Sequence, residues 1–317
     1  MSRILLTAIG SMAAAPVARR YQALGHAVFG CDIYPREWTA LAGELEFFQA
    51  RLATEGEPYV EQLREAVRQD KLDFLIPLTD PEVDALAPRK AEFRALGCTV
   101  CVPEERVAAL CRRKDTMNRF LAEKQVCRLI PTESAVSGQP CPFPFPAMVK
   151  PRSGRSSLGQ AVAADEKSYQ TALAGREDCI VQPFLEGDIF CVDVARDAFG
   201  HTRAAARQEL LRNKSGLGMT VEVLPGHPLE AVCAAIAEAV GLVGVVNMEF
   251  IRHGDDFFFL EVNPRFSGGV GFSMAAGMDF AEMMLCCHSC GSVEAFPAAP
   301  KHALLARESQ IILTKQL

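Results

Sequence analysis

The chain has 317 residues, of which 49% are hydrophobic and 23% charged, and this balance excludes disorder as its main state. Asp and Glu (39) outnumber Lys and Arg (33), so the net charge is −6, and the basic footprint of a nucleic-acid-binding protein is missing. No uninterrupted apolar run reaches the roughly 18 residues of a membrane span. The 12 widely spaced cysteines indicate reduced thiols and therefore a cytoplasmic protein.

Residues 1–103 alternate between short apolar runs and segments with helical spacing. The apolar runs predict buried strands at 4–9, 27–31, 72–77 and 99–102, and the helical spacing predicts helices at 13–24, 59–69 and 83–96. Strands that alternate with helices are typical of a parallel sheet covered by helices on both faces. We therefore expect an N-terminal doubly wound α/β domain that ends near Pro103.

The region after Pro103 has a different pattern. Residues 104–124 have a charged helical pattern, and the proline-dense segment 138–146 excludes a helix or a central strand. Further strands are predicted at 147–150, 180–181 and 191–195, followed by a helix at 229–240. No internal repeat is visible, so we expect one α+β region rather than two duplicated units.

The segment 245–263 predicts a β-hairpin with two carboxylates on one face. A His-Gly-Asp-Asp turn signal separates two strand-like runs. If the turn centres near Asp255, Glu249 and Glu261 are opposite each other, with their Cβ atoms about 5 Å apart. Asn263 faces the same side, because strand side chains alternate. Two close carboxylates and an amide oxygen suit Mg²⁺, although a hairpin with two solvated glutamates also fits the spacing.

The residues around these carboxylates resemble the metal-binding signature of the ATP-grasp superfamily. The matching residues are Glu261-Val262-Asn263-Pro264-Arg265 and, upstream, Asn247-Met248-Glu249-Phe250. Within the superfamily, residues 105–285 look most like the carbamoyl-phosphate synthase large-subunit branch, with a single ATP-grasp unit. The resemblance implies an α/β domain at 1–103, an ATP-grasp domain at 104–300 (lid lobe about 120–185, metal-binding lobe about 186–300) and a C-terminal tail at 301–317.

The resemblance also implies roles for individual residues. Glu249, Glu261 and Asn263 match the ligands of Mg²⁺, for which Mn²⁺ is a substitute. Arg265 matches a catalytic basic residue that binds the reacting acyl and phosphoryl groups. Lys114 and Lys150 match two lysines on the ATP phosphates, and Lys150 also has a catalytic role. The remaining ATP contacts implied by the glycine-rich lid and the interlobe hinge are Ser153, Gly154, Ser156, Ser157, Gln182, Phe184, Leu185 and, for the ribose, Asp188.

The chain departs from the superfamily pattern at the hinge. Gln182 and Pro183 stand where a glutamate is usual, and Ile189 occupies the commoner position of the ribose-binding acid. From the residues alone, solvated lysines and a plain surface loop are the alternatives for the two lysines and the lid.

Two weaker signals suggest other ligands. Gly10 followed by Asp32 resembles part of a dinucleotide fingerprint for NAD, but the other glycines of that pattern are missing. The cysteines at 98–101 and 286–290 are zinc-type ligands, yet they are too few for a four-ligand site, so we expect buried thiols.

Arg207 and Arg212 either bind an anionic substrate or lie on a solvated strand edge.

Together these residues predict an ATP-dependent ligase. ATP would phosphorylate a small carboxylate, such as an amino acid, and an amine would attack the acyl phosphate. The expected partners are therefore small-molecule substrates, with no nucleic acid and no membrane, and a homodimer is compatible with the sequence. The alternatives are carbamoyl-phosphate-type phosphorylation of bicarbonate or carbamate, and a nucleotide-binding protein without turnover.

Overall fold

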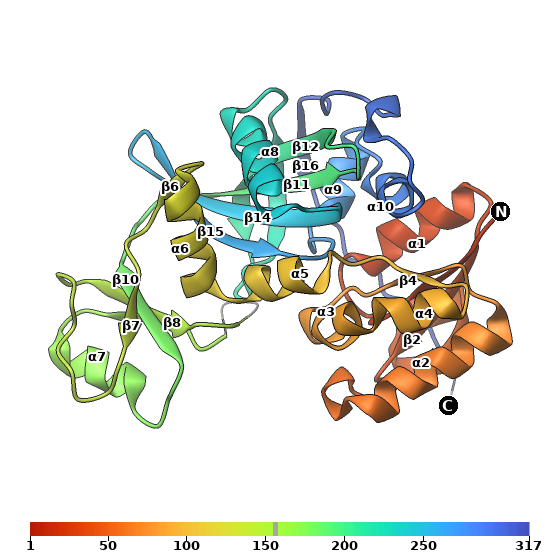
Figure 1. Cartoon of the computed structure of the whole chain (residues 1–317), viewed down its shortest axis with the longest axis horizontal. Helices are drawn as coiled ribbons and strands as arrows, with labels where there is room; N and C mark the ends of the chain where they lie inside the picture. The colour runs from red at the N-terminus through yellow and green to blue at the C-terminus, as the bar shows by residue number, and fades with distance from the viewer. Residues whose placement is uncertain (155–157, 317) are drawn as a thin grey trace.

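The computed structural model describes residues 1–154 and 158–316 and divides them among three sheets (Figure 1). The first sheet is parallel, has five strands in the order β3-β2-β1-β4-β5 and belongs to the N-terminal domain. Its strands are β1 (Arg3–Leu6), β2 (Ala27–Asp32), β3 (Glu46–Gln49), β4 (Phe74–Ile76) and β5 (Thr99–Val100). The strand order reverses between β1 and β4, and ligands of open α/β sheets bind outside the carboxyl ends of strands at such a point.

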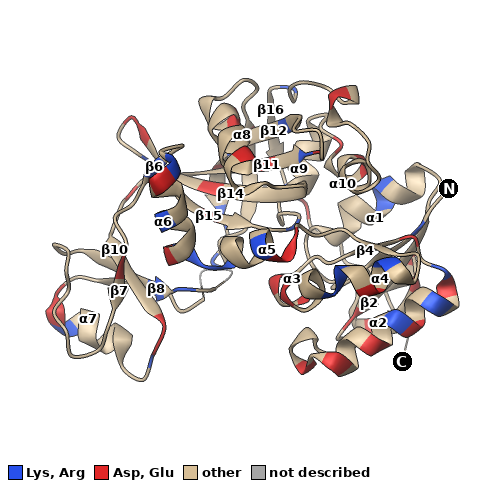
Figure 2. Cartoon of the chain, viewed as in Figure 1, with Lys and Arg blue, Asp and Glu red and all other residues tan. Residues whose placement is uncertain are grey.

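Helices α1 (Ala14–Ala23), α2 (Glu57–Asp70), α3 (Asp80–Leu86) and α4 (Lys90–Ala95) connect these strands. The predicted doubly wound domain is therefore confirmed, with two local corrections. Strand β3 was missed, because its short exposed sequence has no apolar run. The single helix predicted at 83–96 is split by a 3₁₀ turn that contains Pro88, since proline cannot donate the backbone hydrogen bond of a helix interior. Acidic and basic side chains alternate along α2 (Figure 2), where Arg64 pairs with Glu57 and Glu61.

A small four-stranded sheet forms a separate lobe, which is green in Figure 1. Its strands, in the order β7-β10-β8-β9, are β7 (Glu133–Ala135), β8 (Ala147–Pro151), β9 (Ala161–Ala163) and β10 (Cys179–Pro183), and helix α7 (Glu166–Leu173) packs on them. The proline-dense segment 138–146 contains neither helix nor strand, as predicted. Two helices, α5 (Glu105–Arg112) and α6 (Lys114–Lys124), lead into this lobe where one was predicted, and the break falls at Arg113.

The largest sheet has seven strands in the order β16-β13-β12-β11-β14-β15-β6. They are β6 (Arg128–Leu129), β11 (Asp188–Arg196), β12 (Thr202–Arg212), β13 (Gly218–Val223), β14 (Gly244–His253), β15 (Asp256–Asn263) and β16 (Ala303–Ala306). Helix α8 (Pro228–Val240) shares a core with α5 and α6 on one face, through residues such as Val192 and Val194. The other face, through Ala195 and Ala205, packs on α10 (Phe280–His288) and on α1 of the N-terminal domain.

The core shared by α1 and α10 joins the N-terminal domain to the seven-stranded sheet. Tyr21 in α1 is fully buried there and donates its hydroxyl to the backbone oxygen of Ala281, 2.8 Å away. The short helix α9 (Val270–Ala275) packs beside them. Within the described part of the chain, no helix is long and apolar enough to cross a bilayer. The mixed α/β and α+β architecture predicted from the sequence is thus present, with the three sheets meeting around one central cavity.

Candidate functional site

The predicted hairpin is formed by β14 and β15, and it holds Glu249 directly opposite Glu261. The register is not uniform. Asn247 pairs with Asn263 as predicted, but nearer the turn Phe250 pairs with Phe259, so β15 contains an extra residue. The sequence predicted one register along the whole hairpin, and this prediction is wrong between the bulge and the turn, because a bulge shifts the pairing on only one of its sides. The two glutamates lie on the far side of the bulge from the turn, where the predicted opposition holds.

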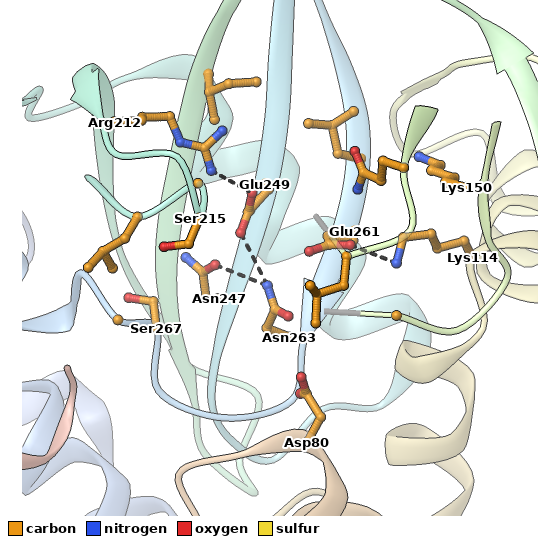
Figure 3. A pocket seen from close by; sticks show the side chains of 18 of the residues that line it. Asp80, Lys114, Lys150, Arg212, Ser215, Asn247, Glu249, Glu261, Asn263 and Ser267 are labelled. Atoms are coloured by element: carbon orange, nitrogen blue, oxygen red, sulfur yellow. Dashed lines mark hydrogen bonds and ion pairs between the residues drawn. The ribbon is translucent and has the colours of Figure 1, made fainter. Parts of the chain in front are cut away.

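A cavity of about 760 Å³ opens in front of this hairpin. The N-terminal domain contributes the loops that follow β1 and β4, and the small lobe contributes β8 and the hinge at the end of β10. The seven-stranded sheet contributes the start of β11, the end of β12, the middle of β14 and the end of β15. The β1 and β4 loops are those at which the strand order of the N-terminal sheet reverses. All three sheets therefore supply walls to one site, as Figure 3 shows at close range.

Two buried lysines face the carboxylates. Lys114 is the first residue of α6, is 8% exposed, and its Nζ lies 2.8 Å from Glu261 Oε2. Lys150 lies in β8 and is 5% exposed. Burial and the neighbouring charge of Lys114 lower the pKa of Lys150 to about 8, partly offset by Glu261. Two neighbouring buried ammonium groups favour an anionic ligand, because added negative charge relieves their repulsion.

The two glutamates are electrostatically unlike. Burial and the charge of Glu261 raise the pKa of Glu249 well above its usual value. Burial alone would also raise the pKa of Glu261, but the charge and hydrogen bond of Lys114, with the charge of Lys150, lower it. Glu249 is therefore the carboxylate that lacks a strong cationic partner, and a metal ion bound between the two would relieve this.

Asn263 completes this face of the hairpin. Its amide nitrogen donates to Glu249 Oε1 at 3.3 Å and to Asn247 Oδ1 at 3.4 Å (Figure 3). Two carboxylates and an amide oxygen form a set of hard oxygen donors. Among the described residues, no group of three or more His, Cys, Asp and Glu side chains is placed to hold a metal. The donor set thus fits an ion that takes few protein ligands and completes its shell with water or phosphate oxygens, as Mg²⁺ does.

The predicted nucleotide residues are only partly brought together. Gly154, Gln182, Phe184 and Leu185 line the cavity. Gln182 is 3% exposed and its side chain donates to Thr132 Oγ1 at 2.6 Å, which leaves the hinge backbone rather than this side chain to face a ligand.

Two other predicted contacts, Ser153 and Asp188, do not line the cavity in the described structure. Ser153 is not among the residues that line it, and Ser156 and Ser157 lie outside the described residues. Asp188, predicted for the ribose, does not line the cavity either, because its carboxylate pairs with Arg252 on β14. Its neighbour Ile189, at the commoner position of this contact, does line the cavity.

The three arginines considered from the sequence have three different surroundings. Arg265 lines the cavity, but its Nε and Nη2 each lie 3.0 Å from a carboxylate oxygen of Asp80. Arg207 is 1% exposed and its Nη1 lies 2.6 Å from Asp193 Oδ2, so neither alternative weighed for it holds. Arg212 lines the cavity with a side chain that is 29% exposed.

Asp80 and Asn247 line the site but were missed in the sequence. Asp80 begins α3 and is fully buried. Its signal was the Thr79-Asp80-Pro81-Glu82 sequence, which is a capping box with proline at the first turn and therefore marks a helix start. Asn247 is buried and donates to Asp193 Oδ1 at 3.2 Å. Nothing in the sequence connects Asn247 with Asp193, since they become neighbours only where β11 pairs with β14.

The NAD and zinc signals lead to no second site. Asp32 is 5% exposed and accepts hydrogen bonds from the backbone nitrogens of Gly10 at 2.7 Å and Tyr34 at 3.2 Å. Its carboxylate therefore stabilises the β1 loop. All twelve cysteines are free thiols, and those at 98, 101 and 287 are buried as expected. The expectation of buried thiols is wrong for the other two of the second cluster, because Cys286 is half-buried and Cys290 is exposed.

Comparisons with known proteins agree with this geometry. Residues 175–310 match a family model described as "ATP-grasp in the biosynthetic pathway with Ter operon". A curated relative, the formate-dependent phosphoribosylglycinamide formyltransferase of Pseudomonas savastanoi pv. phaseolicola, is 28% identical over 222 residues, which are 64% of this chain and 55% of that protein. The chain thus matches little more than half the length of this relative.

Solved structures share the fold at low sequence identity. The biotin carboxylase of Campylobacter jejuni superposes with a TM-score of 0.73 at 16% identity, covering 92% of this chain and 72% of that one. An L-amino acid ligase of Bacillus licheniformis superposes with a TM-score of 0.71 at 14% identity, covering 90% and 73%. The similarity extends over the N-terminal domain as well as the two lobes, because nine-tenths of the chain is covered.

Proposed function

We propose that this chain, which belongs to the ATP-grasp superfamily, is an ATP- and Mg²⁺-dependent ligase that joins a small carboxylate to an amine through an acyl phosphate. One observation carries the proposal: two buried lysines and two opposed glutamates line the same cavity, and Lys114 pairs directly with Glu261. Such an arrangement pairs cations for a polyphosphate with carboxylates for its metal ion. Phosphoryl transfer requires this positioning and charge neutralisation more than it requires a protein nucleophile.

ATP would lie between the small lobe and the seven-stranded sheet. Residues 182–185 supply the hinge wall for the adenine, and Gly154 belongs to the loop that would cover the phosphates. Lys114 and Lys150 would contact the phosphate oxygens. Phosphate binding near Lys150 raises its pKa from about 8, so the lysine carries its full charge when nucleotide is present.

Glu249, Glu261 and Asn263 fit an Mg²⁺ ion, since they offer oxygen donors and include one carboxylate, Glu249, without a strong cationic partner. The ion, when bound, would supply positive charge to the phosphate oxygens of ATP. The protein's own part is to hold these ligands in register. Asn263 is kept in place by Glu249 and Asn247, and Glu261 by Lys114.

The chemistry has two balanced steps. A carboxylate oxygen of the substrate attacks the γ-phosphorus of ATP, the bond to the β-phosphate oxygen breaks, and ADP leaves. The nitrogen of the amine then attacks the acyl carbon, the bond to the phosphate breaks, and the amine loses a proton as phosphate departs. A closed cavity favours this order because water would otherwise hydrolyse the acyl phosphate.

Two features favour ligation over carbamoyl phosphate synthesis. The described residues contain one carboxylate hairpin and one hinge, which is enough to activate one carboxylate per cycle. Two of the named proteins are a formate-dependent transferase and an L-amino acid ligase, and formate and L-amino acids are both small carboxylates. The twelve free thiols also lead us to propose a cytoplasmic location, where cysteines stay reduced.

A hydroxylamine trap tests the proposal. The protein is incubated with ATP, Mg²⁺, hydroxylamine and, separately, L-amino acids, formate or bicarbonate. We expect a hydroxamate from at least one organic carboxylate, formed in step with ADP and abolished by excess EDTA. Glu222→Gln is a matched control, because Glu222 pairs with His302 outside the cavity lining. ADP release with bicarbonate alone and no hydroxamate would favour carbamoyl-type chemistry, and no ADP release with any substrate would favour a nucleotide sensor.

A further inference from the structure

The cavity has a second half, on the side of Glu249 away from the lysines. Figure 3 shows Arg212, Ser215 and Ser267 on this side, and Lys114 and Lys150 on the other. The loops after β1 and β4 of the N-terminal domain close this half, with Met12 and Leu78 among the lining residues. If the lysine side takes the phosphates, the substrate to be phosphorylated must enter from this half.

Arg212 is the cation that this half offers to a substrate. Its guanidinium makes no hydrogen bond within the described structure, and its Nε is buried without a hydrogen-bond partner. The nearest carboxylate oxygens, Glu209 Oε2 and Glu249 Oε2, are both 3.7 Å away. Arg265 differs, because its Nε and Nη2 each donate a hydrogen bond of 3.0 Å to a carboxylate oxygen of Asp80. A planar guanidinium with unused donors is suited to a bidentate carboxylate.

The backbone presents Arg212 to the cavity by means of an irregular strand end. The pairing of β12 with β13 shifts between Glu209 and Leu211 and again between Leu211 and Arg212. Such bulges re-aim side chains. The turn that follows is held by Asn213, whose Oδ1 accepts from the backbone nitrogens of Ser215 and Leu217, each at 3.0 Å. Arg212 therefore lies at the end of β12, before a hydrogen-bonded turn, and beside the proposed metal ligand Glu249.

Besides the carboxylates of Glu209 and Glu249, this half of the cavity presents hydroxyl groups. The hydroxyl of Ser215 donates to Asn213 Oδ1 at 2.8 Å, and that of Ser267 donates to Asp193 Oδ1 at 2.8 Å, so both are engaged within the protein. Four of the described lining residues are cationic. Lys114, Lys150 and Arg265 are three of them, and Arg212 is the fourth. The side chain of Leu217 packs closely against Gly268, because a Cβ atom added at Gly268 would lie only 2.7 Å from Leu217 Cδ1. This contact narrows this half of the cavity. Arg212 can therefore pair with one carboxylate, whereas a second anionic group such as a phosphate would find no further cation among the described lining residues of this half.

We propose, on the basis of the ligase function above, that Arg212 clamps the carboxylate to be phosphorylated, and that this carboxylate belongs to a small amino acid with an uncharged side chain. The clamp places the carboxylate oxygens beside Glu249, which is one of the residues that would hold Mg²⁺. Arg212 is thus a residue that touches substrate. Phosphate-bearing acceptors are disfavoured because the described lining of this half offers no second cation.

Equilibrium binding tests this assignment without relying on turnover. L-alanine, L-serine and O-phospho-L-serine are titrated by calorimetry into the protein saturated with Mg²⁺ and a non-hydrolysable ATP analogue. We expect wild type to bind L-alanine and L-serine, and to bind O-phospho-L-serine at least about tenfold more weakly than L-serine. Arg212→Ala should lower the affinity for L-alanine by about 30-fold, and Arg212→Lys by about tenfold, because lysine cannot form the bidentate pair.

The controls separate a carboxylate clamp from a structural role. Arg203→Lys, a variant on the same strand whose guanidinium contacts backbone oxygens of Glu294 and Phe296, should bind L-alanine within about twofold of wild type. The affinity of Arg212→Ala for the nucleotide analogue should stay within about threefold, because the lysines hold the phosphates.

Three results would overturn the proposal: unchanged L-alanine binding in Arg212→Ala, tighter binding of O-phospho-L-serine than of L-serine, or no binding of L-alanine or L-serine by wild type. A hydroxamate formed by wild type from some other carboxylate would then leave the ligase function standing and reject only the assigned substrate.

Discussion

Arg265 and Asp80 form a two-pronged ion pair that links the seven-stranded sheet to the N-terminal domain across 185 residues of sequence. Arg265 Nε and Nη2 each lie 3.0 Å from one carboxylate oxygen of Asp80, which is fully buried at the start of α3. Arg265 also donates to the backbone oxygen of Phe266. The pair therefore fixes the loop after β15 against the loop after β4, and both loops line the cavity.

Breaking this pair should loosen the site. Asp80→Asn should lower the free energy of unfolding by about 3 kcal/mol, because it leaves Arg265 without its carboxylate partner in a partly buried position. Asp84→Asn is the matched control, since Asp84 is 47% exposed and pairs with Arg112 at the surface; it should cost less than about 1 kcal/mol. Urea unfolding measures both. Equal losses in the two variants would contradict a special role for Asp80.

The two glutamates should respond oppositely to neutralisation, although both changes should abolish turnover. Because the pKa of Glu249 is raised, its ionised form destabilises the metal-free protein, and this penalty grows as pH rises above the ordinary value of 4.5. Glu249→Gln should therefore increase apo stability more at pH 8 than at pH 5. Glu261→Gln should decrease it at pH 8, because Lys114 loses its partner.

Thermal melting without metal, at the two pH values, compares these glutamine variants with wild type. A similar stabilisation by both substitutions would show that their mutual repulsion outweighs the Lys114 pair. Retained activity in the presence of excess EDTA would contradict the metal role itself.

Lys150 should give the metal-free protein a pH-dependent stability. Its pKa is about 8 when folded and 10.5 ordinarily, so between these values the unfolded state binds more protons. Wild-type stability should therefore rise relative to Lys150→Met as pH increases from 8 to 10.5, by up to about 3 kcal/mol. Urea midpoints across this range measure the difference. Lys167→Met, at an exposed position of α7, should show no such trend.

Gly187 should be intolerant of any side chain. It stands between the hinge and β11, and a Cβ atom there would lie 1.7 Å from the backbone oxygen of Arg252. Gly187→Ala should thus cost at least about 2 kcal/mol, because the clash involves backbone and cannot be relieved by a rotamer change. Gly43→Ala is the control. It should be nearly neutral, because no atom beyond its chain neighbours lies within 4 Å of a Cβ atom added at Gly43. Matching urea midpoints for the two variants would rule out the close approach.

The local features of this protein could be predicted because each depends on residues close in sequence. The parallel strands of the N-terminal sheet follow from apolar runs. The opposition of Glu249 and Glu261 was predicted from a turn centred near Asp255, whereas the observed turn pairs His253 with Asp256 and the bulge restores the opposition. The short strand β3 escaped detection because few of its residues are buried. The bulge in β15 escaped because an extra residue leaves no mark on the hydrophobic pattern.

What the sequence by itself determined is therefore the set of chemical groups and the hairpin that holds its carboxylates. Which groups remain available to a ligand was decided only by the tertiary structure. Arg207, Arg212 and Arg265 look equivalent in the sequence. In the structure Arg207 forms a buried ion pair with Asp193, and Arg265 forms an ion pair with Asp80. Arg212 is left in the cavity with unused hydrogen-bond donors. These partners come from distant segments, and because an ion pair depends on distance in space rather than along the chain, only packing could distinguish the three arginines.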